Sequence, residues 1–81
     1  MFKNKASNGK NNICGLTIRN KRKTLGLSQR ELADKLQIAG LDIGKNGVQK
    51  IESGERFVTD IELVYISDVL SITVIDLLYS N

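Results

Sequence analysis

The sequence lacks several residues on which enzymes, metal sites and disulfide-bonded domains depend. Its 81 residues include no proline, no tryptophan and no histidine, and only one cysteine. Without histidine the commonest general base is missing, and a lone cysteine forms neither an intramolecular disulfide nor a zinc site. No Walker-type glycine-rich loop occurs, and the acidic residues are scattered rather than paired. We therefore expect a binding protein that is not an enzyme and uses no metal or cofactor.

Long apolar runs are also absent. The longest run is far too short to span a bilayer, and residues 1–12 lack the apolar block of a signal peptide. The single cysteine is compatible with a reducing compartment. We expect a cytoplasmic protein without a membrane partner. A chain of this length buries only about 60–65% of its unfolded surface, so its core is small.

Each end of the chain lacks charges of one sign. Residues 1–30 contain no acid and the residues beyond Phe57 contain no base, although the net charge is only +3. The first segment carries Lys3, Lys5, Lys10, Arg19, Lys21, Arg22, Lys23 and Arg30, and the last carries Asp60, Glu62, Asp68 and Asp76. This polarity favours a protein that places one face on a polyanion. A solvated basic tail beside an acidic helical surface is the alternative.

Apolar residues at helical spacing predict an all-α domain over residues 13–81. Five helices are expected, over 13–25, 29–38 and 45–52, then from Thr59 and from near Thr73. Ser28 with Glu31, and Thr59 with Glu62, are typical of capping boxes at helix starts. Gly40 is expected to end the second helix in a left-handed conformation.

The apolar stripes predict which side chains are buried. In the first helix the stripe contains Cys14, Gly15, Ile18, Arg22 and Leu25, and in the fourth it contains Ile61, Val64, Tyr65 and Val69 or Leu70. The fifth helix is apolar nearly all round, with Val74, Ile75, Leu77, Leu78 and Tyr79. Such a helix needs cover on more than one face, which we assign to the core and to a second subunit. A wholly intramolecular role is the alternative.

The third expected helix has two distinct faces. Val48 and Ile51 point inward, while Lys45, Asn46, Gln49 and Lys50 lie on an outer face without acids. A cationic, amide-rich face of this kind suits the major groove of DNA. Gly44 stands at the N-cap and Gly47 lies inside the helix, where glycine costs about 1 kcal/mol relative to alanine. Either packing and DNA hold the helix, or a bare backbone is wanted near the groove wall.

Several short motifs occur together in one known family. They are the run Gly15-Leu16-Thr17-Ile18-Arg19, then Arg22, Leu25-Gly26-Leu27-Ser28-Gln29, Glu31-Leu32-Ala33, and Ile51-Glu52-Ser53-Gly54 with Arg56. With them, the chain resembles the phage repressor/Cro-type helix-turn-helix family over about residues 13–79. The resemblance implies a five-helix, lambda-repressor-like DNA-binding domain. The turn before Lys45 is longer than in the shortest members.

The resemblance also implies roles for individual residues. Gln29 would donate to a DNA phosphate, with Arg30, Arg19 and Arg56 as further phosphate contacts. Arg22 and Glu52 would form a structural ion pair between the first and third helices. For Lys45, Asn46, Gln49 and Lys50 we expect contacts to base edges, although each lysine could instead be a solvated charge or a phosphate contact.

These observations predict a transcriptional regulator, and more specifically a repressor that binds double-stranded DNA as a homodimer through the fifth helix. Its half-sites would lie one helical turn apart, about 34 Å. Control would come from concentration, proteolysis or a regulatory protein partner. An antitoxin-like role, and a protein-interaction module that has lost DNA binding, are the alternatives. Residues 1–12 are expected to be a disordered basic tail or an arm on DNA phosphates.

Overall fold

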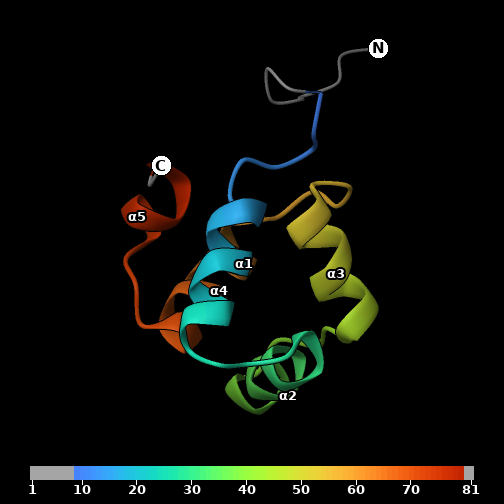
Figure 1. Ribbon diagram of the computed structural model, residues 1–81, viewed down its shortest axis with the longest axis vertical. Helices are drawn as coiled ribbons and strands as arrows, with labels where there is room; N and C mark the ends of the chain where they lie inside the picture. Colours follow the sequence, from blue (N-terminus) through green and yellow to red (C-terminus); the bar gives the residue numbers. More distant parts are fainter. Residues whose placement is uncertain (1–8, 80–81) are drawn as a thin grey trace.

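Five helices and no strand make up residues 9–79, the part of the chain that the computed structural model describes (Figure 1). The helices are α1 (Gly15–Thr24), α2 (Gln29–Ala39), α3 (Lys45–Ser53), α4 (Asp60–Leu70) and α5 (Val74–Tyr79). The predicted all-α fold is confirmed, because each expected helix is present within a few residues of its expected bounds.

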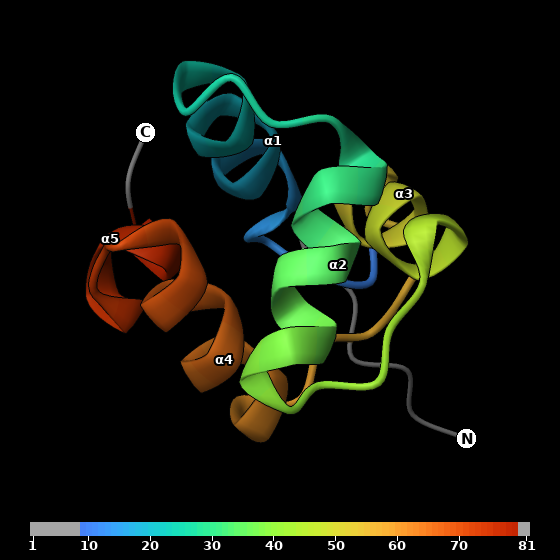
Figure 2. The ribbon, with the colours of Figure 1, turned by 90° about the horizontal axis from the view of Figure 1, so that it is seen from below.

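The helices surround a single core. α3 and α5 lie on opposite sides of α1 and α4, and α2 crosses the end of this group (Figures 1 and 2). Fully buried aliphatic side chains come from all five helices: Ile18, Leu32, Leu36, Val48, Ile51, Ile66, Leu70 and Leu77. Burial of each such side chain contributes about 1.5–3 kcal/mol to folding. The core therefore fixes the position of α3, whose outer face is left to solvent.

Local sequence signals set the helix ends. At the start of α2, Glu31 N–H donates to Ser28 Oγ over 3.0 Å, and Ser28 N–H donates to Glu31 Oε1 over 2.9 Å. The hydrogen bonds from Ser28 lower the pKa of Glu31. Gly40 ends α2 at φ 116°, which lets Leu41 N–H donate back to Leu36 O over 2.9 Å. The predicted capping box and glycine stop are both confirmed.

The predicted inward face of α4 is correct in part: Leu70 is buried and Tyr65 and Val69 pack against the core, but the two residues of the first half fail. Ile61 and Val64 are 66% and 53% exposed, whereas Ile66 and Leu70 are buried. In the first turn, Glu62 turns back to accept a hydrogen bond from Thr59 N–H over 2.9 Å, which completes the capping box predicted at Thr59 and Glu62. The predicted stripe of the first helix also fails at its end, because Leu25 is 44% exposed.

Residues 9–12 are ordered, in contrast to the disorder predicted for residues 1–12. Asn11 N–H donates to Gly54 O over 2.8 Å, so this segment lies against the loop that follows α3. Residues 1–8 lie outside the described part of the chain. Contacts to residues far along the sequence thus stabilise a segment whose own composition is polar.

Candidate nucleic-acid interface

A turn anchored by one buried side chain places α3 on the surface of α2. Ile43 is 4% exposed, and the carbonyl of the same residue accepts a hydrogen bond from Gln37 Nε2 over 2.8 Å. Leu41 is half-buried and Asp42 is exposed. Gly44 is the N-cap of α3 and supplies no side-chain hydrogen bond. The turn is therefore held by side-chain packing and by Gln37 rather than by a capping side chain.

Intramolecular packing accounts for the glycine inside α3. A Cβ on Gly47 would lie 2.6 Å from Ile43 Cγ1 and 3.0 Å from Arg56 Nη1. Ile43 thus fills the space that a side chain at this position would need. The absence of a side chain at Gly47 therefore leaves room for Ile43 in the turn before α3.

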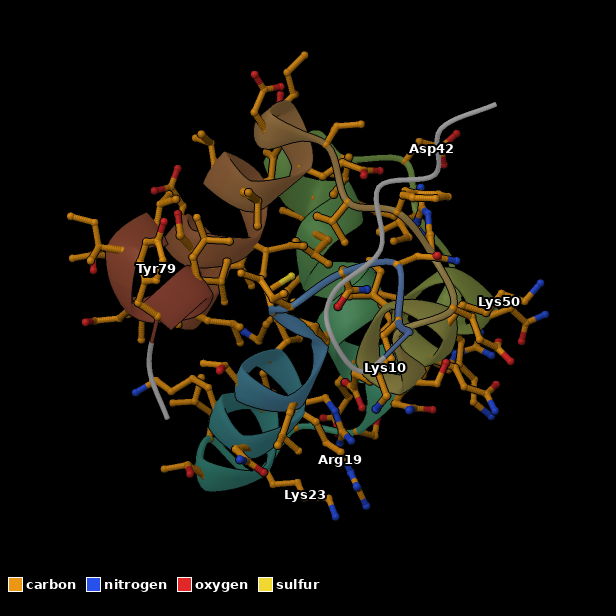
Figure 3. All side chains as sticks on the ribbon, turned by 90° about the horizontal axis from the view of Figure 1, so that it is seen from above. Lys10, Arg19, Lys23, Asp42, Lys50 and Tyr79 are labelled. Atoms are coloured by element: carbon orange, nitrogen blue, oxygen red, sulfur yellow. The ribbon has the colours of Figure 1, made fainter. Side chains whose placement is uncertain are left out.

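The outer face of α3 carries the predicted base-contacting residues. Lys45, Asn46, Gln49 and Lys50 are all exposed, while Val48 is 1% exposed and faces the core. Figure 3 shows Lys50 extending into solvent on the same side of the molecule as Arg19, away from Tyr79. The arrangement presents ammonium and amide donors together, and amide oxygens as acceptors.

Arg22 and Glu52 form the predicted pair. Arg22 Nε donates to Glu52 Oε2 over 2.7 Å and Nη2 donates to Oε1 over 3.0 Å, so the contact is bidentate. The two side chains are only 9% and 3% exposed. Hydrogen bonding to Glu52 raises the pKa of Arg22. A third guanidinium nitrogen donates to Leu27 O over 2.7 Å, which ties α1 to the segment before α2.

Gln29 joins this ion pair. Its Nε2 donates to Glu52 Oε1 over 3.1 Å, although the family resemblance implied a phosphate contact alone. A primary amide has two N–H donors, so the second remains for another acceptor. Glu52 therefore connects α1, α2 and the end of α3 through one carboxylate.

A shallow hollow lies beside this carboxylate. It has a volume of about 230 Å³ and is lined by Arg19, Gln29, Gln49, Glu52 and Ser53. The residues come from α1, α2 and α3, and Gln29 is the first residue of α2. The N-terminal amides of a helix attract anions. Because Arg22 neutralises Glu52, the remaining groups of the hollow suit an anion such as a phosphate.

Arg56 and Arg30, the other predicted phosphate contacts, lie differently. Arg30 is exposed on α2. Arg56 Nη2 donates to Glu62 Oε2 over 2.7 Å, and the arginine side chain is 34% exposed. Arg56 thus links the loop after α3 to the first turn of α4, a role that the sequence did not indicate.

Chemical reactivity is not evident at Cys14, the single thiol. It is 1% exposed, and burial raises its pKa to about 11, so the thiol stays neutral. Among residues 9–79, no cluster of acidic, cysteine or histidine side chains could hold a metal ion. No helix of this part is long and apolar enough to cross a membrane.

Two helices joined by a turn, of which the second helix has a polar outer face, define a helix-turn-helix protein. A family profile described as helix-turn-helix matches residues 18–77. The chain belongs to this helix-turn-helix family and is a DNA-binding transcription regulator, which confirms the resemblance found in the sequence. Regulators of this kind are typically not enzymes. The chain matches no curated protein sequence at a significant level.

Solved structures share the fold. The P22 c2 repressor, in complex with a synthetic operator, has a TM-score of 0.73 at 22% identity and covers 85% of this chain and 97% of its own. The controller protein C.AhdI from Aeromonas hydrophila has a TM-score of 0.69 at 26% identity, over 79% and 89% of the two chains. The regulator ClgR from C. glutamicum has a TM-score of 0.72 at 24% identity, over 84% and 82%.

Proposed function

We propose that the protein binds a specific double-stranded DNA site as a homodimer, places α3 in the major groove and acts as a repressor. The observation that carries this proposal is the outer face of α3. This face is cationic and amide-rich, lacks acids and is exposed, while the opposite face is buried in the core. The P22 c2 repressor, which has a similar fold, was solved with its operator.

Base edges are contacted by the exposed residues of α3 in this proposal. Lys45 and Lys50 donate to guanine O6 and N7, and Asn46 pairs with adenine N6 and N7. Gln49 lies both on the outer face and at the rim of the anion-suited hollow. It therefore contacts a base or the adjacent phosphate.

A backbone phosphate occupies the hollow beside α2. Gln29 has one amide N–H left after its bond to Glu52, and Arg19 supplies a positive charge. Arg30 makes a less directed contact from the exposed side of α2, and Arg56 contacts a second phosphate with the N–H groups that Glu62 does not use. These contacts orient the domain and carry no sequence information.

The dimer forms through α5. Leu77 is fully buried and belongs to the core, so it satisfies part of the apolar surface of this helix within the subunit. Ile75 and Tyr79 are 69% and 72% exposed. A second copy would cover them. Substitution of Tyr79 or Ile75 by aspartate should weaken the dimer in sedimentation velocity while folding is retained, whereas a strictly monomeric wild type would contradict this interface.

The test of the function is selection from a pool of random duplex DNA. We expect an enriched site with two related half-sites and a log K that falls by about 0.9 per neutralised phosphate against log salt. Lys50→Ala should weaken the best site by about 1–3 kcal/mol and leave random DNA unchanged, whereas Gln29→Ala should weaken both alike. Lys35→Ala removes the same charge outside α3 and is the matched control. Absence of any enriched sequence would refute the proposal.

A further inference from the structure

A short segment before α1, within the predicted disordered tail, joins the first turn of α1 to the last turn of α3. We propose that Asn12 is a positioning residue: it fixes the orientation of α3 relative to α1 and so aligns the base-contacting side chains. The predicted effect of Asn12 on DNA recognition rests on the proposed function. The effect of Asn12 on the orientation of α3 is independent of DNA.

Asn12 makes three hydrogen bonds that join two helices. Its Nδ2 donates to Ile51 O over 3.0 Å and to Arg56 O over 2.7 Å. Its Oδ1 accepts from Gly15 N–H over 2.9 Å, at the first residue of α1. The acceptors are carbonyl oxygens and the donor is an amide, so only one orientation of the side-chain amide satisfies all three bonds.

The contact leaves no room for adjustment. A Cβ at Gly15 would overlap Ile51 O and would lie 3.0 Å from Glu52 O. The backbone of α1 therefore touches the backbone of α3 next to the Asn12 side chain. Main-chain contact of this kind transmits a displacement directly, because no side chain lies between the two backbones at Gly15.

Asn12 acts at the same end of α3 as the Arg22–Glu52 pair, but on backbone atoms. The Asn12 bonds restrict rotations of α3 that the ion pair alone would allow. With a rise of about 1.5 Å per residue, Lys45 lies about 9 Å along the axis from Ile51. A tilt of about 7° about Ile51 would move Lys45 by about 1 Å, and a shift of that size lengthens a hydrogen bond beyond its normal range.

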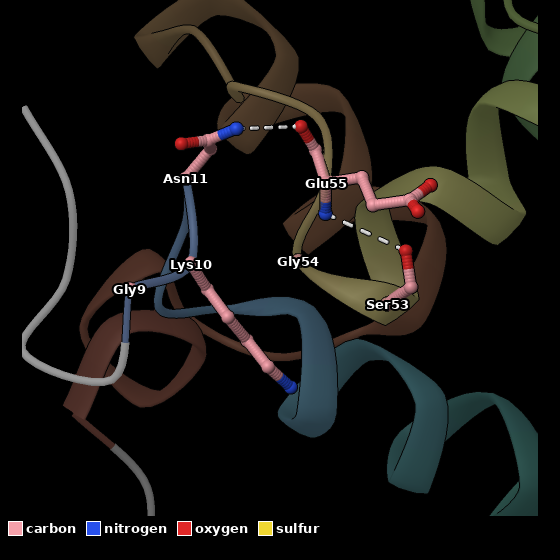
Figure 4. A pocket seen from close by; sticks show the side chains of 6 residues that line it. All are labelled: Gly9, Lys10, Asn11, Ser53, Gly54 and Glu55. Carbon is pink, nitrogen blue, oxygen red and sulfur yellow. Dashed lines mark hydrogen bonds between the residues drawn. The ribbon is translucent and has the colours of Figure 1, made fainter. Parts of the chain in front are cut away.

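The neighbouring Asn11 offers a matched control. Its Nδ2 donates to Glu55 O over 2.8 Å, in the loop beyond α3, as Figure 4 shows. It is the same residue type in the same segment, yet its side-chain hydrogen bond ends in the loop and not on α1 or the helical part of α3. Substitution of either asparagine by serine removes the amide donors, and Asn12→Ser keeps an oxygen that can cap α1.

The experiment compares wild type, Asn12→Ser and Asn11→Ser in two ways. Residual dipolar couplings of the free proteins report the orientation of α3 relative to α1. Titrations with the selected duplex and with random duplex give the ratio of the two affinities. We expect Asn12→Ser to reorient α3 and to lower the affinity ratio about five- to tenfold, in the lower part of the range for a lost base contact. Asn11→Ser should change neither.

Each measurement has an outcome that overturns the inference. An unchanged α3 orientation in Asn12→Ser shows that Asn12 only stabilises the fold, whatever the protein does with DNA. A reoriented α3 with an unchanged affinity ratio removes the link to base recognition. If wild type itself shows no preference for any duplex, the proposed function fails while the dipolar couplings still decide the role of Asn12. Should Asn12→Ser not fold, Asn12→Ala, which places no acceptor against the carbonyl oxygens of Ile51 and Arg56, is measured in its place.

Discussion

The two ends of α3 are held in different ways. At the C-terminal end, a buried ion pair, the Asn12 amide and a backbone contact at Gly15 converge on the last turn. At the N-terminal end, Gly44 supplies no capping side chain, and the packing of Ile43 against Gly47 is the main support. The firmly held end faces α1, while the sparsely held end carries Lys45 and Asn46.

This difference shows how a small domain combines a fixed helix with an accessible one. Side chains that hold a helix must be buried or paired, so they cannot also contact a ligand freely. By concentrating the attachments at one end, α3 leaves its first two turns exposed. Substitutions at the two ends should therefore change the free energy of unfolding by different amounts, and one of them should raise it.

The largest effect is expected at the ion pair. Arg22→Ala leaves Glu52 buried without its partner and should lower the free energy of unfolding by about 3–5 kcal/mol. Replacing both residues by apolar ones of similar volume should cost much less. Urea denaturation of the two single variants and the double variant measures the coupling. A coupling energy near zero would mean that the two charges act independently.

The next largest effect is expected at Gly15. Gly15→Ala adds a Cβ that overlaps Ile51 O, so α1 and α3 must separate, and we expect a loss of about 1–3 kcal/mol in the free energy of unfolding. Leu16→Ala is the control, because the Leu16 side chain is 62% exposed and its loss should cost little. Equal losses for both variants, measured by thermal or urea denaturation, would show that the close approach does not matter.

At the opposite end, Gly47→Ala sets two effects against each other. Alanine raises the helix propensity by about 1 kcal/mol, whereas the added Cβ presses on Ile43 at a cost of about 1–3 kcal/mol. We expect a net loss of about 1 kcal/mol by urea denaturation. In an Ile43→Val background, which frees part of the space, the same change should cost less. A net gain in the wild-type background would show that Ile43 moves aside easily.

The smallest effect, and the one of opposite sign, is expected at Gly44. The backbone there is extended, with φ −99° and ψ 179°, and nothing lies within 4 Å of an added Cβ. Gly44→Ser should gain a few tenths of a kcal/mol by capping α3. Thermal denaturation should show a higher melting temperature, and urea denaturation should show an unchanged m-value. A loss of stability would mean that the N-terminal turn already relies on the glycine.

Local signals in the sequence predicted the helix ends well, because capping boxes and left-handed glycines act within three to five residues. Sequence periodicity succeeded only in part for α4, since apolar residues occur on several sides of that helix: Leu70 is buried, whereas Ile61 and Val64 are exposed. The ion pair of Arg22 and Glu52 was implied by the family resemblance, and the structure contains it.

The role of Asn12 could not be predicted from the sequence. Its partners Ile51 and Arg56 lie 39 and 44 residues further along the chain, and a polar, glycine-containing segment carries no local sign of them. Gln29 was predicted as a phosphate contact, and its bond to Glu52, which depends on the angle between α2 and α3, was not predicted. That angle is set by the longer turn, which the sequence left undetermined.

The single thiol of the chain can report how often the contact between the start of α1 and the end of α3 opens. Cys14 lies between Asn12 and Gly15, is 1% exposed, and has a pKa raised to about 11 by burial. A thiol reagent can therefore modify it only when the start of α1 separates from the rest of the domain. With no other cysteine in the chain, the labelling rate in native buffer reports how often that separation occurs at this one residue, without an introduced cysteine.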